Sequence, residues 1–163
     1  MNRGKTRSDL DKEITAFHEA GHAVVAWLLG CDRIRVAVWP NPDGDENDAK
    51  YWLGNCSHSE TGTGSQKHGL AGLAAEIIRE NPDSDGYELQ EFIDCGIIEP
   101  SETDRAAMDG YTIDDCQNVV AMLRANWAVV TDLANLLQSD EILTDHLFSE
   151  FIQGYKVLPW LEA

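Results

Sequence analysis

The sequence predicts a mainly α-helical fold with a small antiparallel β-ribbon. Most of the chain carries apolar residues at three- and four-residue spacing, which is the period of an amphipathic helix. Residues 34–39 and 51–58 instead have the pattern of short strands. With 163 residues, 43% of them hydrophobic, the chain is long enough for one well-filled core and too short for two ordinary domains. We therefore expect a single domain over residues 1–163, with residues 1–8 flexible.

The first predicted helix covers residues 9–29. Ser8 followed by Asp11 is typical of a capping box, and Gly30 is a typical C-terminal stop. The buried stripe of this helix consists of Ile14, Phe17, Gly21, Val24, Val25, Leu28 and Leu29. A glycine inside a helix costs about 0.5–1 kcal/mol relative to alanine. We therefore expect another backbone, or a substrate, to approach the helix closely at Gly21.

The two predicted strands follow this helix. Residues 34–39 alternate apolar with polar or small side chains, as a half-buried strand does. A turn-rich acidic loop at residues 40–48 separates them from residues 51–58, so the two strands are expected to pair antiparallel. Gly54 in the second strand suits a bulge or a close neighbour.

Helical patterns occupy the rest of the chain. One covers residues 66–80, and a short helix is expected within residues 87–98. Another begins at residues 100–104 and is interrupted near Gly110. Thr112 precedes a single long pattern that continues to Leu137, and residues 145–151 form a terminal helix.

The formal charge of −17 results from 29 acidic and 12 basic residues. Such a surface repels phosphate backbones and anionic lipid, so we expect no nucleic-acid and no membrane partner. The basic residues 1–7 are not followed by an apolar core, and no signal peptide is predicted. The most apolar run, residues 23–29, is far shorter than the roughly 18–20 residues that span a bilayer.

The cysteines are widely scattered and form no CxxC pair. They are Cys31, Cys56, Cys95 and Cys116. Thiols are therefore expected in preference to a disulfide framework or a zinc knuckle, and a cytoplasmic protein is the consistent interpretation.

The most informative motif is the HExxH pentapeptide His18-Glu19-Ala20-Gly21-His22. Residues four apart on a helix return to the same face, so His18 and His22 can bind one Zn²⁺, and Glu19 can take a proton from zinc-bound water. The alternative is a helix with an ordinary solvated polar face. The histidines lie beside the buried stripe, however, where unpartnered polar groups cost a few kcal/mol each and a metal ion would satisfy both.

Catalytic zinc usually has three protein ligands, so one is still missing. The remaining histidines, His58, His68 and His146, and many carboxylates are candidates. Composition alone does not choose among them.

The segment 15–28 resembles the zinc-binding helix of the FtsH-type ATP-dependent zinc proteases, whose motif reads HEAGHA. Further similar segments follow in the family's order and cover nearly the whole chain. They are residues 33–40 (first strand), 52–54 (the "LGY" segment), 71–76 (the "GGRAAE" helix, with Leu73 where arginine is usual), and 124–137 with 142–144 (the closing helices). The resemblance implies a helical zinc-peptidase domain with Zn²⁺ as cofactor.

The resemblance also suggests the third ligand. In that family it is an aspartate that follows a Ser/Ala-Asn-like turn at the start of a later helix. The matching segment is residues 101–107, which nominates Asp104. Ser101 with Asp104 also fits a capping box, which needs no metal. Glu76 is the rival, either as the third ligand or as a carboxylate that supports the site.

Members of that family normally carry membrane segments and an ATPase with a GxxxxGK[ST] loop. Neither Gly4-Lys5-Thr6 nor residues 61–69 completes such a loop. We therefore expect a stand-alone zinc endopeptidase module that cleaves peptides or unfolded protein segments, with an ATPase partner acting in trans if one exists. The alternative is a catalytically silent metal-binding regulatory or interaction module. The oligomeric state stays open.

Overall fold

The computed structural model describes residues 4–44, 50–59 and 65–155. Within them the chain forms seven helices and one three-stranded antiparallel sheet, which confirms the predicted mainly α fold with a small β component. The elements are α1 (Arg7–Leu28), β1 (Arg35–Pro40), β2 (Trp52–Ser57), α2 (Ser65–Glu80), α3 (Gly86–Asp94), α4 (Glu102–Met108), α5 (Ile113–Ala125), α6 (Trp127–Asp140), β3 (Ile142–Leu143) and α7 (Asp145–Gln153).

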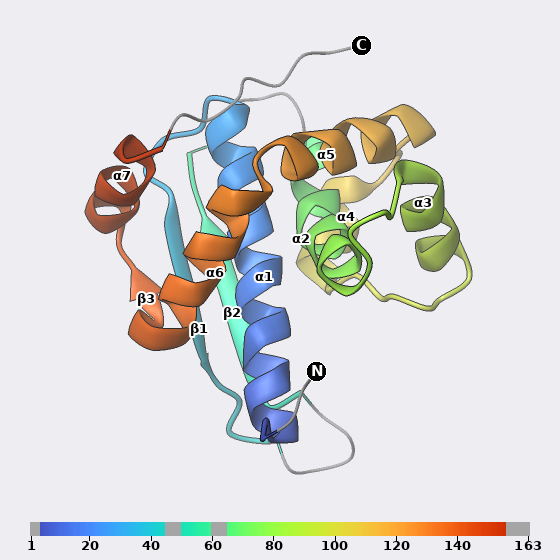
Figure 1. Cartoon of the computed structure of the whole chain (residues 1–163). Coiled ribbons are helices and arrows are strands. Elements are labelled where there is room, and N and C mark those ends of the chain that lie inside the picture. The colour runs from blue at the N-terminus through green and yellow to red at the C-terminus, as the bar shows by residue number, and fades with distance from the viewer. Residues whose placement is uncertain (1–3, 45–49, 60–64, 156–163) are drawn as a thin grey trace.

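Helix α1 is the centre of the molecule. The sheet lies on one side of it, α2 to α5 lie on the other, and α6 crosses it (Figure 1). Its middle is buried nearly all round, because Thr15, Ala16, Phe17, Glu19, Ala20, Gly21, Ala23, Val24, Val25 and Ala26 are all buried. A helix covered on most sides is held in position by its neighbours, so side chains projecting from α1 have a well-defined direction.

The start of α1 differs from the prediction. A capping box is present, but it joins Thr6 and Asp9, whose side chains each accept a hydrogen bond from the other's backbone N–H. The predicted Ser8–Asp11 box is wrong because both residues lie inside the helix and contact β2 instead. The Ser8 hydroxyl accepts from the Trp52 indole N–H at 3.1 Å, and Asp11 accepts from the Trp52 backbone N–H at 2.9 Å. Of the segment expected to be flexible, residues 1–3 lie outside the described residues, and α1 includes the last two.

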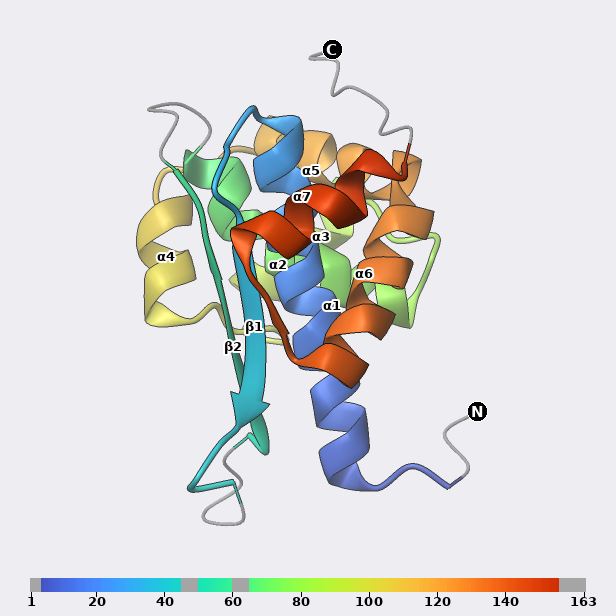
Figure 2. The ribbon, with the colours of Figure 1, turned by 90° about the vertical axis from the view of Figure 1, so that its left-hand side faces the viewer.

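The predicted antiparallel pairing of the first two strands is confirmed, with Arg35 opposite Ser57 and Pro40 opposite Trp52. Pairing continues regularly through Gly54, so no bulge occurs there. A third strand was missed. The resemblance places residues 142–143 with the closing helices, but β3 pairs with β1 to give the order β2-β1-β3 (Figure 2). Two residues are too few to show an alternating pattern. Residues 45–48 of the predicted acidic loop lie outside the described residues.

Close packing of α1 on α2 explains Gly21. A Cβ built on it would lie 2.6 Å from the Ala75 Cβ and 2.8 Å from the Ala71 carbonyl oxygen. The expected approach of another backbone is therefore confirmed. It places the HExxH turn directly against α2.

The long helix predicted after Thr112 is in fact two helices, α5 and α6, separated at Asn126. The buried Asn126 side chain donates to the Met122 carbonyl at 3.0 Å, in place of a backbone N–H from the next turn. The physical reason for the break lies in tertiary packing. Helix α5 packs on α2 and α3, whereas α6 packs on α1 and β1, so the chain must change direction between them.

The other predicted helices, α2, α3, α4 and α7, agree with the structure to within a few residues. Among the described helices, none has both the length and the apolar content that crossing a bilayer requires.

Candidate metal centre

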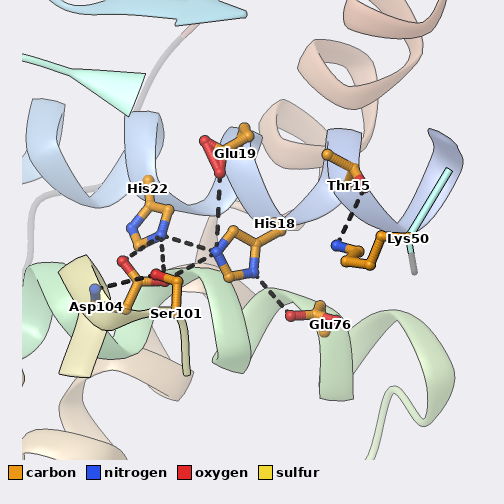
Figure 3. Close-up of polar contacts among 8 residues, drawn as sticks. All are labelled: Thr15, His18, Glu19, His22, Lys50, Glu76, Ser101 and Asp104. Atoms are coloured by element: carbon orange, nitrogen blue, oxygen red, sulfur yellow. Dashed lines mark hydrogen bonds and ion pairs between the residues drawn. The ribbon is translucent and has the colours of Figure 1, made fainter. Parts of the chain in front are cut away.

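Helix α1 presents His18 and His22 on the same side, one turn apart, and both rings point toward α2 and α4 (Figure 3). Their Nε2 atoms lie 3.1 Å apart. The ring planes are inclined at 74°, so the rings do not stack, and their two Nε2 atoms converge on one region. This is the arrangement expected from the four-residue spacing of the motif.

Asp104 of α4 completes a group of three donors. Its Oδ2 lies 3.0 Å from the His18 Nε2 and 3.3 Å from the His22 Nε2. Ser101 caps α4 by accepting from the Asp104 N–H, as the capping interpretation requires. The Asp104 carboxylate does not return to the cap, and it contacts the imidazoles instead. Gly69 allows this position, because a Cβ on it would lie 2.7 Å from the Asp104 carbonyl oxygen.

The three donors fit a metal ion. A tetrahedral ion with bonds of about 2.0–2.1 Å separates its ligand atoms by about 3.3 Å. The observed separations are 3.0, 3.1 and 3.3 Å. Because the His18 Nδ1 contacts the Glu76 carboxylate, an N–H lies there, and the Nε2 faces Asp104 and His22. Two imidazole nitrogens and a carboxylate oxygen this close together repel one another unless a proton or a cation lies between them.

Glu76 lies behind the site. Its Oε2 accepts from the His18 Nδ1 at 2.7 Å, on the far side of the ring from Asp104. A carboxylate in this position orients a metal-binding imidazole and raises its basicity. The structure therefore brings Asp104, and not Glu76, to the two Nε2 atoms of His18 and His22.

The ring of His18 lies directly over Gly72 of α2, and a Cβ on Gly72 would overlap it. We expect Gly72→Ala to displace the ring, break its hydrogen bond to Glu76 and weaken zinc binding by at least about 10-fold. Losing the hydrogen-bond partner of a metal-binding histidine typically costs about 10–100-fold in affinity. Titration with zinc against a competing chelator measures this. Gly154→Ala is the control, because a Cβ there has its nearest contact at 3.4 Å. Unchanged zinc affinity in Gly72→Ala would mean that the ring position is irrelevant to binding.

Glu19 follows His18 on α1, and its carboxylate approaches the His18 ring (Figure 3). It is 5% exposed, its Oε1 lies 3.8 Å from the His18 Nε2, and its Oε2 has no hydrogen-bond partner among the described residues. Gly54 of β2 makes room for it, since a Cβ there would lie 2.5 Å from the Glu19 Cγ. Burial raises the pKa of Glu19, and the nearby His18 and His22 oppose that rise. A buried carboxylate with an unpaired oxygen and a raised pKa is suited to accept a proton.

The electrostatics of the metal-free site favour a bound proton. Burial disfavours the charged form of His18, but its hydrogen bonds to Asp104 and Glu76 prevail and raise its pKa to about 10. Burial also opposes ionisation of Asp104, yet the hydrogen bonds from His18 and His22 hold its pKa well below the usual range. Without metal, an imidazolium–carboxylate pair therefore occupies the site at neutral pH.

This pair predicts proton release when zinc binds. At pH 7–8, below the His18 pKa of about 10, zinc must displace one proton from this site. The apparent zinc affinity should therefore fall about tenfold for each unit by which the pH decreases in this range. Calorimetry in buffers of different ionisation enthalpy measures the protons released. His146→Ala, which changes an exposed histidine on α7, should leave the number unchanged, and zinc binding without proton release would contradict the expectation.

A cleft of about 620 Å³ opens over the site. The catalytic candidates Glu19, His18, His22 and Asp104 line it, together with the end of β2 and residues 97–101. A polypeptide segment entering the cleft would therefore reach all four side chains.

The other histidines do not join these donors. His146 lies exposed on α7 and pairs with Glu150 at 3.1 Å. His58 and His68 also line the cleft, but they gather with Cys31 in a second group whose donor atoms lie within 4.8 Å of one another. Burial, reinforced by His58 and His22, lowers the pKa of His68 to about 4, so its ring is neutral. No spacing in the sequence could have revealed this group, because its members come from three separate segments.

No family model matches the chain, and no curated protein matches it either. The functional assignment therefore depends on the geometry of the site and on the motif resemblance.

Proposed function

We propose that the chain is a zinc-dependent endopeptidase similar to the FtsH-type peptidases, acting on peptides or unfolded protein segments. His18, His22 and Asp104 would hold the ion, and Glu19 would serve as the base. One observation carries the proposal. Two imidazole nitrogens and a carboxylate oxygen converge at separations of 3.0–3.3 Å beside a buried glutamate that has an unpaired oxygen.

Each side chain has a definite task in this proposal. Zinc, when bound, supplies Lewis-acid chemistry that makes water nucleophilic near neutral pH and polarises a carbonyl group. Glu19 accepts the proton of the attacking water and delivers it to the leaving amine. Its burial raises its pKa and makes it a stronger base than an exposed glutamate. Glu76 holds the His18 ring in place through its Nδ1.

The sheet offers a way to align a substrate. Strand β2 pairs only with β1 in the described sheet, so an extended peptide could pair with its other edge beyond Trp52, whose N–H already donates to Asp11, and Asn55 on β2 lines the cleft. The net charge of −17 favours neutral or basic polypeptides. The resemblance adds an ATPase partner in trans as the source of unfolded substrate. The four cysteines, present as thiols, fit a cytoplasmic location.

Metal removal tests the proposal. We expect the purified chain to cleave casein or a fluorogenic peptide, to lose this activity after chelator treatment and to regain it on addition of zinc. Failure of the zinc-loaded chain to cleave any such substrate would favour the alternative, a catalytically silent metal-binding module. Activity that resists complete metal removal would exclude a metallopeptidase.

A further inference from the structure

The second group of donors, Cys31, His58 and His68, is not used by the proposed reaction. One ligand atom from each lies within 4.8 Å of the others. We propose that these three residues form a second metal site, for a thiolate-preferring ion of the zinc class. A thiolate with two imidazoles is a donor set that zinc prefers and that magnesium and calcium do not.

The backbone holds the three segments together. Gly30, with φ +88°, ends α1 in a left-handed turn, and the Cys31 N–H bonds back to the Ala26 carbonyl at 3.0 Å. The end of β2 is tied to the same turn by two hydrogen bonds between Asp32 and Ser59, each 2.9 Å. These bonds place His58, which precedes Ser59, beside Cys31. The relative position of Cys31 and His58 is therefore set by backbone hydrogen bonds and does not depend on side-chain rotamers alone.

His68 reaches the pair from the first turns of α2. Its Nε2 lies 3.8 Å from the Cys31 Sγ. A tetrahedral zinc ion, with bonds of about 2.3 Å to sulfur and 2.0–2.1 Å to nitrogen, separates such atoms by about 3.6 Å. The two are therefore already near the spacing of ligands that share one ion.

The hydrogen bonds of the two imidazoles also suit metal binding. The His58 Nδ1–H donates to the Ser59 carbonyl at 2.8 Å, which leaves its Nε2 as a lone-pair donor, the tautomer typical of metal-binding histidines. The buried His68 Nδ1 has no hydrogen-bond partner among the described residues. The rings stack at 4.6 Å with planes inclined at 28°, so binding requires a tilt that brings both lone pairs to one point. Within the described ranges, no hydrogen bond to the His68 Nδ1 resists that tilt.

The site would lie in the wall of the proposed catalytic cleft, because His58 and His68 line that cleft. An ion there would join the end of α1, the end of β2 and the start of α2. Its donors are all different from those of the HExxH site, so this proposal does not depend on the proposed function.

Cobalt provides the test, because a thiolate bound to Co²⁺ gives a near-ultraviolet charge-transfer band that nitrogen and oxygen ligands do not. We expect the full chain, kept reduced with a phosphine, to bind about two ions of Zn²⁺ or Co²⁺ and to show this band with cobalt. Cys31→Ser should lose the band and about one ion. The matched control is Cys95→Ser, which changes an exposed thiol and should keep both ions and the band.

Two further variants make the result decisive. His22→Ala should lose the HExxH ion yet keep the thiolate band, which separates failure of the proposed function from failure of this site. His58→Ala should behave as Cys31→Ser does, and it decides the matter if Cys31→Ser fails to fold by circular dichroism. A wild-type chain that binds one ion with no thiolate band would overturn the proposal. So would a band that survives in both Cys31→Ser and His58→Ala.

Discussion

Glu19→Gln should lower the rate of peptide cleavage by at least about 100-fold while zinc stays bound, because general-base catalysis contributes about 10²–10⁴-fold. The amide has nearly the shape of the carboxylate but cannot accept a proton from water. The Glu19 Oε2 has no hydrogen-bond partner among the described residues, so the change breaks no bond there. Cleavage of a fluorogenic peptide and the zinc content of the same sample are the two measurements.

Glu91→Gln is the matched control, because Glu91 is exposed on α3 and does not line the cleft. It should retain both activity and zinc. Full activity in Glu19→Gln would rule out the proposed base. Loss of zinc in that variant would instead show that Glu19 supports the metal site, a role that its 3.8 Å distance from the His18 Nε2 does not favour.

Asp104→Asn should lower zinc affinity by more than about 100-fold. Losing a residue that only hydrogen-bonds to a metal ligand typically costs about 10–100-fold, and Asp104 is proposed as a ligand itself. The carboxylate lies next to the Nε2 atoms of His18 and His22, and its negative charge would attract a zinc ion bound between them. His18→Ala should have a similar effect. Glu76→Gln should cost only about 10–100-fold, because Glu76 contacts the other nitrogen of His18. Zinc titration against a chelator of known affinity ranks the three variants.

The ranking also decides between the two carboxylates. A larger loss for Glu76→Gln than for Asp104→Asn would make Glu76 the ligand. Asp109→Asn, at the exposed end of α4, is the control for changing an acidic residue on this helix and should leave zinc binding unchanged. The Asp→Asn and Glu→Gln variants keep side-chain volume, so a folded sample is expected of each, and circular dichroism checks that His18→Ala still folds.

Local patterns predicted much of the fold. Helical periodicity located α1, α2 and α7 to within a few residues, and alternation located β1 and β2. The helical period also placed His18 and His22 on one face, since residues four apart are neighbours in any α-helix. These features depend on backbone geometry over a few residues, which sequence spacing reports directly.

Other features were decided by contacts between distant segments. Asp104 and Glu76 lie 86 and 58 residues from His18, and only the packing of α2 on α1 and of α4 on α2 determined which imidazole nitrogen each one reaches. The break at Asn126 and the strand β3 arose because each segment follows the surface that it packs against. The group of Cys31, His58 and His68 likewise exists only where three chain segments meet. Spacing along a chain does not encode such meetings, because they depend on how whole helices and strands pack together.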